Sequence, residues 1–122
     1  MVISQLPLAR QLDIVFQQLR NELSQQPSGT VFIQIRNNLI GKFGVRHLPF
    51  EAKDGKFEQQ PQKGLSGTQI SSFLRVAKES LAYKSHWTHG EIYMDYTVRQ
   101  SSLCASVMFE SNYNMAHLMP VD

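Results

Sequence analysis

The sequence predicts a two-layer α+β domain, in which two helices pack on one face of an antiparallel sheet of four or five strands. Three patterns indicate this fold class: an apolar stripe of helical period near the N-terminus, a second such stripe behind a helix-start signal, and odd–even alternation over residues 91–110. The expected order of elements is α-β-β-(β)-α-β-β. All 122 residues are assigned to one domain, residues 1–122, because a chain of this length buries about two-thirds of its surface on folding.

The first helix is expected over residues 4–24. Its apolar residues recur at a spacing that places them on one helix face, namely Leu8, Leu12, Val15, Phe16, Leu19 and Leu23. Gln11 is among the polar residues expected on the other faces. Because Pro7 fits only the first turn of a helix, the helix should begin near Ser4 or Leu6.

The second helix is expected over residues 67–83, after a polar linker at residues 59–65. Ser66 and Gln69 have the spacing of a capping box, in which each side chain bonds the other residue's backbone N–H. The apolar stripe that follows contains Ile70, Phe73, Leu74, Ala77 and Leu81.

Four segments alternate between apolar and polar residues, as strands of a half-buried antiparallel sheet do. Two flank a turn at Asn37-Asn38 and cover about residues 31–36 and 39–47. Two more cover residues 91–99 and 103–110, with apolar side chains at alternate positions. The alternation predicts one packed face and one face open to solvent.

Asp54-Gly55 is a strong two-residue hairpin signal between residues 48–53 and 56–59. Pro49 cannot donate a ladder hydrogen bond, so this hairpin arm is expected at the sheet edge or as a bulged continuation of the sheet. Residues 111–122 have no clear period and are expected to be loop-like.

Composition excludes several functional classes. A single cysteine excludes a disulfide scaffold or a Cys-rich zinc module. No run approaches the roughly 20 apolar residues that span a bilayer, so no membrane partner is expected. The first seven residues lack the basic start and apolar core of a secretion signal, which predicts a cytoplasmic protein. Gly41-Lys42-Phe43-Gly44 lacks the hydroxyl and following helix of a phosphate loop, and no cofactor is expected.

The solvent face of the predicted sheet is the main candidate for function. If the alternation holds, its residues are Gln34, Arg36, Lys42, Arg46, Tyr93, Asp95, Thr97, Arg99, Cys104, Ser106 and Met108. Tyr, Met and Arg are enriched in protein interfaces, whereas a plain solvated face is the alternative. The candidate protein-binding residues are Arg36, Arg46, Tyr93, Arg99 and Met108.

The absence of a converging set of acid, base, nucleophile or metal ligands favours a non-enzymatic protein-binding protein: an adaptor, an assembly factor or a regulator. A protein partner is therefore expected. A homodimer is also expected, because a small sheet with a free edge and an exposed face tends to be covered, most often by symmetric pairing.

An alternative is a metal-dependent or small-molecule-binding enzyme that uses His86, His89, Glu91 and Asp95, with His86 and His89 as metal ligands. Residues three apart share a face only on a helix, whereas Gly90 and the following strand place both histidines in a loop. This favours instead a Trp87 side chain that closes the end of the core beside solvated histidines.

A third hypothesis is weak nucleic-acid binding through the cations of the same sheet face, Arg36, Lys42, Arg46 and Arg99. The net charge of +2 is small for a protein that binds nucleic acid electrostatically, which speaks against nucleic acid as a partner.

The order of one helix, three strands, one helix and two strands is similar to that of the small dimeric chaperones of type III secretion. Those chaperones usually end in a further helix, whereas Pro120 in the tail disfavours one here. Those chaperones are also often acidic, whereas this chain has a formal net charge of +2. A similar order of elements implies neither a function nor site residues for this chain.

Overall fold

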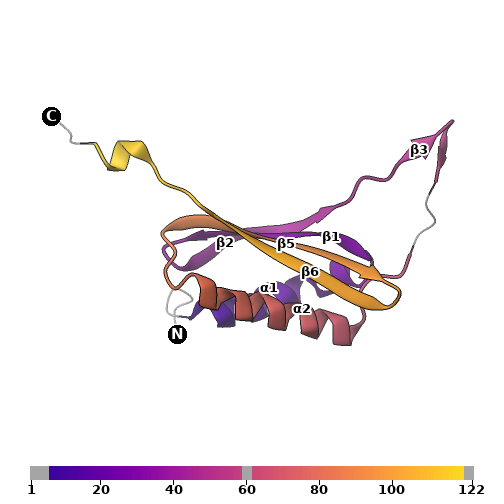
Figure 1. Cartoon of the computed structure of the whole chain (residues 1–122), viewed down its shortest axis with the longest axis horizontal. Coiled ribbons are helices and arrows are strands. Elements are labelled where there is room, and N and C mark those ends of the chain that lie inside the picture. The colour runs from indigo at the N-terminus through magenta and orange to yellow at the C-terminus, as the bar shows by residue number, and fades with distance from the viewer. Residues whose placement is uncertain (1–5, 59–61, 120–122) are drawn as a thin grey trace.

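The computed structural model describes residues 6–58 and 62–119, and it confirms the predicted α+β class. A four-stranded antiparallel sheet has the strand order β2-β1-β5-β6. Its strands are β1 (Ser28–Arg36), β2 (Leu39–His47), β5 (His89–Arg99) and β6 (Ser102–Ser111). Two helices, α1 (Leu8–Leu23) and α2 (Gly67–Ser80), lie on one face of this sheet (Figure 1).

Helix α1 begins later than the sequence predicted. Its first residue is Leu8, and Pro7 is the N-cap residue just outside the helix rather than part of the first turn. Of the predicted start positions, Ser4 lies outside the described residues, and Leu6 precedes the helix. The predicted apolar stripe is otherwise correct, since every member except Leu8 is buried.

Gln11 is buried, which corrects its expected place on a polar face. Its side-chain amide donates hydrogen bonds to the carbonyls of Leu6 and Asn38, at 2.9 and 3.0 Å, and accepts one from the Ile40 N–H at 2.7 Å. A buried amide is tolerated because its hydrogen bonds are made. Gln11 thereby attaches α1 to the turn between β1 and β2.

Helix α2 begins as predicted, with the capping box of Ser66 and Gln69 formed in both directions. Its α-helical part ends at Ser80, and the last predicted turn is a 3₁₀ helix, η2 (Leu81–Tyr83). The preceding linker is not wholly polar and exposed, because Gly64 and Leu65 are buried against the end of α1. The Leu65 N–H donates to the Leu23 carbonyl at 2.9 Å.

Two-residue turns join the strands of both hairpins in the main sheet. Asn37 and Asn38 join β1 to β2 with φ of 52° and 61°, and Gln100 and Ser101 join β5 to β6 with φ of 51° and 66°. Positive φ at both central residues matches the right-handed twist of the flanking strands. The ladder between β5 and β6 then continues without interruption from Arg99↔Ser102 to Gly90↔Ser111.

The hydrophobic core lies between the helices and the inward residues of the sheet. Its largest buried side chains include Trp87 and Phe73, and Phe73 packs against the rings of Phe16 and Tyr96, each at 5.2 Å between centroids. Trp87 is fully buried and contacts Phe109 edge to face, so the prediction that it closes the end of the core is confirmed.

The Asp54-Gly55 hairpin forms, but it does not join the main sheet. Strands β3 (Ala52–Lys53) and β4 (Lys56–Phe57) make a separate two-stranded sheet. We call residues 48–58 the hairpin arm. Figure 1 shows the arm rising from the end of β2, away from the helices. The main sheet therefore has four strands, not five.

A second arm follows β6. Residues 112–119, which we call the C-terminal arm, include a 3₁₀ turn, η3 (Met115–His117), and are otherwise loop-like, as expected. This arm leaves the sheet at the end opposite the hairpin arm, and both arms bend toward the side of the sheet that the helices do not cover (Figure 1). Within residues 6–58 and 62–119, neither helix combines the length and the apolar character required to cross a membrane.

Gly90 provides a test of the packing between Trp87 and β6. A Cβ atom at Gly90 would lie 2.4 Å from the Glu110 carbonyl oxygen and 2.6 Å from the Trp87 ring. We expect Gly90→Ala to lower the free energy of unfolding by about 1–3 kcal/mol in urea denaturation, because overpacking displaces neighbours. Gly41→Ala is the matched control, since no atom lies within 4 Å of its added Cβ. Equal stabilities would contradict this packing.

Tyr96 provides a test by pH. Its hydroxyl is buried and has no hydrogen-bond partner among the described residues. Burial, and secondarily the charge of Glu22, raises the pKa of Tyr96 from 10.0 to about 12. The folded chain then holds this proton more tightly than the unfolded chain, so stability is complete below pH 10 and falls as the pH rises toward 12.

We expect Tyr96→Phe to reduce this alkaline loss of stability, measured by urea denaturation at neutral pH and at about pH 11. At neutral pH the variant should be at least as stable as the original chain, because the removed hydroxyl is buried and has no hydrogen-bond partner among the described residues. A variant with the same alkaline loss as the original would contradict the assignment to Tyr96.

Candidate functional site: the uncovered face of the sheet

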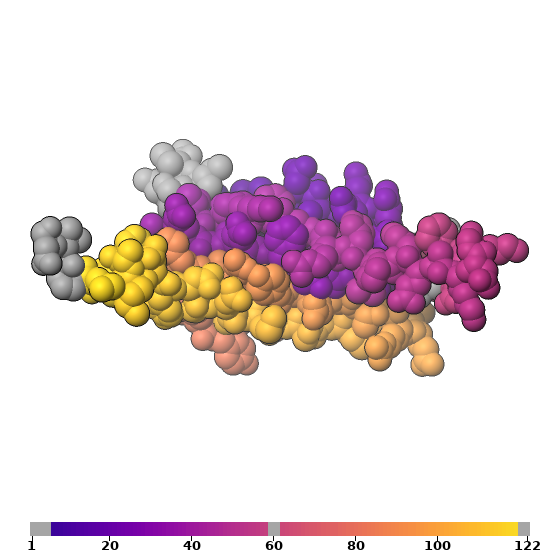
Figure 2. Space-filling model, turned by 90° about the horizontal axis from the view of Figure 1, so that it is seen from above, coloured from indigo at the N-terminus to yellow at the C-terminus, as the bar shows by residue number. Residues whose placement is uncertain are grey.

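We call the sheet face opposite the helices the outer face. Figure 2 looks onto it, with the hairpin arm and the C-terminal arm extending at opposite ends. Alternation along the strands places Thr30, Phe32 and Gln34 of β1 on this face, together with the odd-numbered residues of β5 and the even-numbered residues of β6. No helix of the described chain covers it.

An apolar row crosses the centre of the outer face. Phe32, Tyr93 and Met108 are directly opposite one another on β1, β5 and β6. The Phe32 ring extends over Gly44 on β2, where an added Cβ would lie 2.9 Å from the ring. The row remains accessible, since Met108 is 62% exposed.

Polar side chains border this row. The Lys42 ammonium lies 6.0 Å from the centre of the Phe32 ring, within reach of a cation–π interaction. The Tyr93 hydroxyl donates a hydrogen bond to the Glu91 carboxylate, and the Thr30 hydroxyl donates one to the Asp95 carboxylate. The carboxylates of Glu91 and Asp95 are thus hydrogen-bonded to neighbouring hydroxyls on the outer face. The Arg46 side chain is exposed opposite Thr30.

The five predicted binding residues do not form one cluster. Tyr93 and Met108 are cross-strand neighbours, and Arg46 is opposite Thr30 in the row next to theirs. Arg36 and Arg99 lie at opposite ends of the sheet, because Arg36 is opposite His89, ten residues before Arg99 on β5. At about 3.3 Å per residue, this separation is about 33 Å. Arg36 and Arg99 are also two of the four cations proposed for nucleic-acid binding, so that set does not form one cluster either.

We call residues 84–88, which connect η2 to β5 and contain Trp87, the histidine loop. His86 is exposed, and its Nδ1 accepts a hydrogen bond from the Asn38 side-chain amide at 3.2 Å. The Asn38 carbonyl Oδ1 accepts the Trp87 backbone N–H at 2.8 Å. His89 lies instead in β5, opposite Arg36.

The four residues of the metal-site alternative are therefore spread from the loop along β5. Glu91 and Asp95 are four residues apart on one strand, about 13 Å. Over residues 6–58 and 62–119, no three His, Cys, Asp or Glu side chains come close enough together to hold a metal ion.

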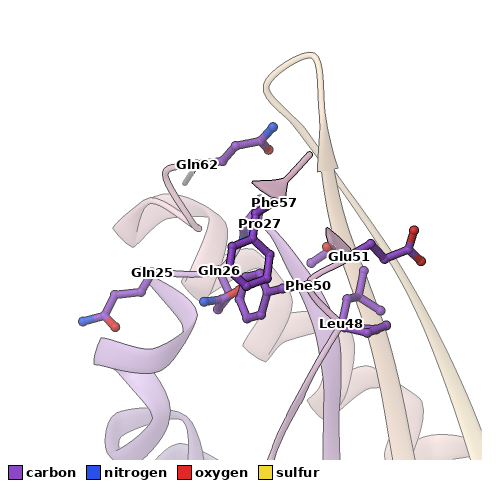
Figure 3. Close-up of a pocket in the computed structure, with 10 residues that line it drawn as sticks. Gln25, Gln26, Pro27, Leu48, Phe50, Glu51, Phe57 and Gln62 are labelled. Carbon is purple, nitrogen blue, oxygen red and sulfur yellow. The ribbon is translucent and has the colours of Figure 1, made fainter. Parts of the chain in front are cut away.

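Sequence reasoning missed a cavity of about 800 Å³ between the hairpin arm and the turn after α1. Leu48, Phe50 and Phe57 of the arm and Pro27 of the turn give it apolar walls, and glutamine side chains lie around it (Figure 3). Both phenylalanines remain about two-thirds exposed. Three large apolar side chains in a short polar hairpin were the available sequence signal.

The C-terminal arm has a similar character. Four large apolar side chains are exposed on it: Tyr113, Met115, Leu118 and Met119. At its base, a cavity of about 460 Å³ is lined by Arg36 and His89 from the outer face and by arm residues that include His117. The arm therefore continues the outer face at one end, as the hairpin arm does at the other.

Comparison of the chain with family models, with curated proteins and with solved structures found no match.

Asn38 provides a test of the histidine loop. We expect Asn38→Gly to lower the free energy of unfolding by about 1–2 kcal/mol, because the Trp87 N–H loses its acceptor while the positive φ is still allowed. Asn37→Gly preserves the turn and is the control, and His86→Ala should have little effect because His86 is exposed. Thermal or urea unfolding of the three variants measures this. A larger loss for His86→Ala would reverse the roles assigned to these residues.

Proposed function

We propose that this chain is a non-enzymatic protein-binding protein, an adaptor, assembly factor or regulator, whose partner lies on the outer face between the two arms. One observation carries the proposal: most of the large apolar side chains exposed in the described chain belong to the outer face or to the two arms at its ends. They are Leu48, Phe50, Phe57, Met108, Tyr113, Met115, Leu118 and Met119. A concentration of exposed apolar surface marks interaction sites in soluble proteins.

Energetics support a macromolecular partner. Full burial of one large apolar side chain contributes about 1.5–3 kcal/mol. The arms offer such groups at both ends of the face, and the row of Phe32, Tyr93 and Met108 lies between them. A partner that spans this length gains from all three places, whereas a small molecule reaches only one.

The charges suggest the chemistry of the partner segment. Lys42 and Arg46 lie on the β2 side of the row, whereas Glu91 and Glu110 face each other on the β5–β6 side. Charge complementarity favours a segment that places an apolar side chain on the row and a carboxylate toward β2. The acids among the cations disfavour a nucleic-acid backbone, which is uniformly negative.

The proposal includes a cytoplasmic location, which the sequence alone supports. Its single cysteine, Cys104, has no second cysteine to form an internal disulfide, which fits a compartment where thiols stay reduced.

Site-specific photo-crosslinking in the native host tests the proposal. A photoreactive amino acid is placed at Phe57 on the hairpin arm, at Met108 on the central row, and at Ile14, an exposed apolar residue of α1, as the control. We expect Phe57 and Met108 to capture the same protein and Ile14 to capture none. Capture of nucleic acid, capture of this chain alone, or capture from Ile14 only would contradict the proposal.

The captured protein then allows a binding measurement. We expect the double substitution Phe50→Ser with Phe57→Ser to weaken its binding at least about tenfold in calorimetric titration, because two aromatic anchors are lost. Ile14→Ser is the matched control and should leave the affinity unchanged, since Ile14 lies on the helical side. Equal losses from both would place the partner elsewhere.

A further inference from the structure

The free edge of β6 has unusual properties. The Asn112 N–H donates to the His89 carbonyl, which identifies the even-numbered residues of β6 as the ones hydrogen-bonded to β5. By alternation, Leu103, Ala105, Val107 and Phe109 direct their backbone N–H and C=O groups away from β5. In the described part of the chain, no strand pairs with this side of β6.

The two edges of the sheet differ in how they are protected. The β2 edge has an irregular register opposite Ile33–Ile35 and exposes Lys42 and Arg46, and bulges and cations discourage pairing with another strand. The β6 edge has ten residues in regular register, with no proline, lysine or arginine, and Glu110 is its only charged residue. A long, regular and nearly uncharged edge is a template for a further strand.

The helix beside this edge exposes apolar side chains in the same direction. The Gln69 side chain donates to the Ser101 carbonyl in the β5–β6 turn, so this side of α2 lies over β6. Val76 follows Gln69 by seven residues, two turns of α2, and therefore lies on the same side of the helix. Tyr83 lies in η2, one 3₁₀ turn beyond the end of α2 at Ser80. Val76 and Tyr83 are 37% and 87% exposed. Below them, Leu103, Val107 and Phe109 are only partly buried.

We infer that β6 pairs antiparallel with β6 of a second copy of this chain, forming an eight-stranded sheet with its two-fold axis at Ser106. This register aligns nearly the whole strand. It pairs Leu103 with Phe109 and Ala105 with Val107 on the helical side, and Cys104 with Met108 on the outer face. No like charges oppose each other, since Glu110 meets Ser102.

A second copy fits this edge better than an unrelated strand does. A two-fold axis perpendicular to the sheet brings the second α2 alongside the first, so that Val76 and Tyr83 of each copy face the other helix. An isolated strand would satisfy the backbone groups of β6 but would leave these two side chains exposed. Symmetric pairing of two copies would both hydrogen-bond the free backbone groups of β6 and cover Val76 and Tyr83. Each copy would use the same surface, as the two subunits of an isologous interface do.

Disulfide trapping tests the register. In a Cys104→Ser background, Ser106→Cys places one cysteine from each copy on the axis, opposite each other in a non-hydrogen-bonded pair, at a Cα separation of about 4.5 Å that permits a disulfide. We expect rapid formation of a covalent dimer on mild oxidation. Ser102→Cys in the same background is the control, because the two cysteines would then be about 26 Å apart and should not link. A preferred link through Ser102→Cys, or none through Ser106→Cys, overturns the proposal.

Sedimentation of the full chain tests the interface itself. Ala105→Pro removes an N–H that points to the free edge and not to β5, so the protomer should keep its sheet, as circular dichroism would verify. We expect the original chain to sediment as a dimer and Ala105→Pro to weaken the dimer at least about tenfold.

The double substitution Val76→Glu with Tyr83→Glu should also weaken the dimer, because it places charges where the two α2 helices meet. It tests the interface if the proline variant does not fold. Ile14→Glu on the far helix should remain dimeric. A monomeric original chain, or a dimer that survives both the edge and the helix substitutions, overturns the proposal.

Discussion

The structure depends on one constraint: two helices cover one face of the sheet, while every strand distributes its side chains between both faces. In β5, Ile92, Met94 and Tyr96 are buried beneath the helices, and the residues between them therefore emerge on the outer face. The same periodicity that builds the core thus produces the exposed row of Phe32, Tyr93 and Met108. The described chain has only these two layers, so none of its helices covers the apolar side chains of that row.

The two ends of the sheet are fixed to very different degrees. At the end formed by the β1–β2 turn, Gln11 attaches α1 to the turn, Asn38 bonds the loop before β5, and Trp87 fills the space between them. At the opposite end, the hairpin arm extends beyond the body, and within the described residues its two strands pair only with each other. Buried polar networks of the first kind make a structure unique. The exposed apolar residues of the hairpin arm lie where no such network exists.

The outer face and the β6 edge present different chemistry and therefore suit different partners. The edge offers backbone donors and acceptors in regular spacing, which another strand satisfies regardless of most side chains. The face offers aromatic and thioether side chains with mixed charges, which require a complementary surface. Pairing at β6 would leave the outer face open and would place two copies of it side by side, so that the two proposals are compatible and independent of each other.

The sequence by itself determined the fold class, the apolar helix stripes, the capping box and the odd–even alternation of the strands, because these depend on neighbours within a few residues. Only the tertiary structure decided which polar residue enters the core, as Gln11 does, since the Asn38 carbonyl and the Ile40 N–H that it bonds come from a distant segment of the chain. Three further features depend likewise on how the strands are arranged in space. They are the distance between Arg36 and Arg99, the position of the β3–β4 hairpin outside the main sheet, and the cavity beside Phe50 and Phe57. Local periodicity gives the direction of a side chain, whereas its neighbours across the sheet follow from register and strand order.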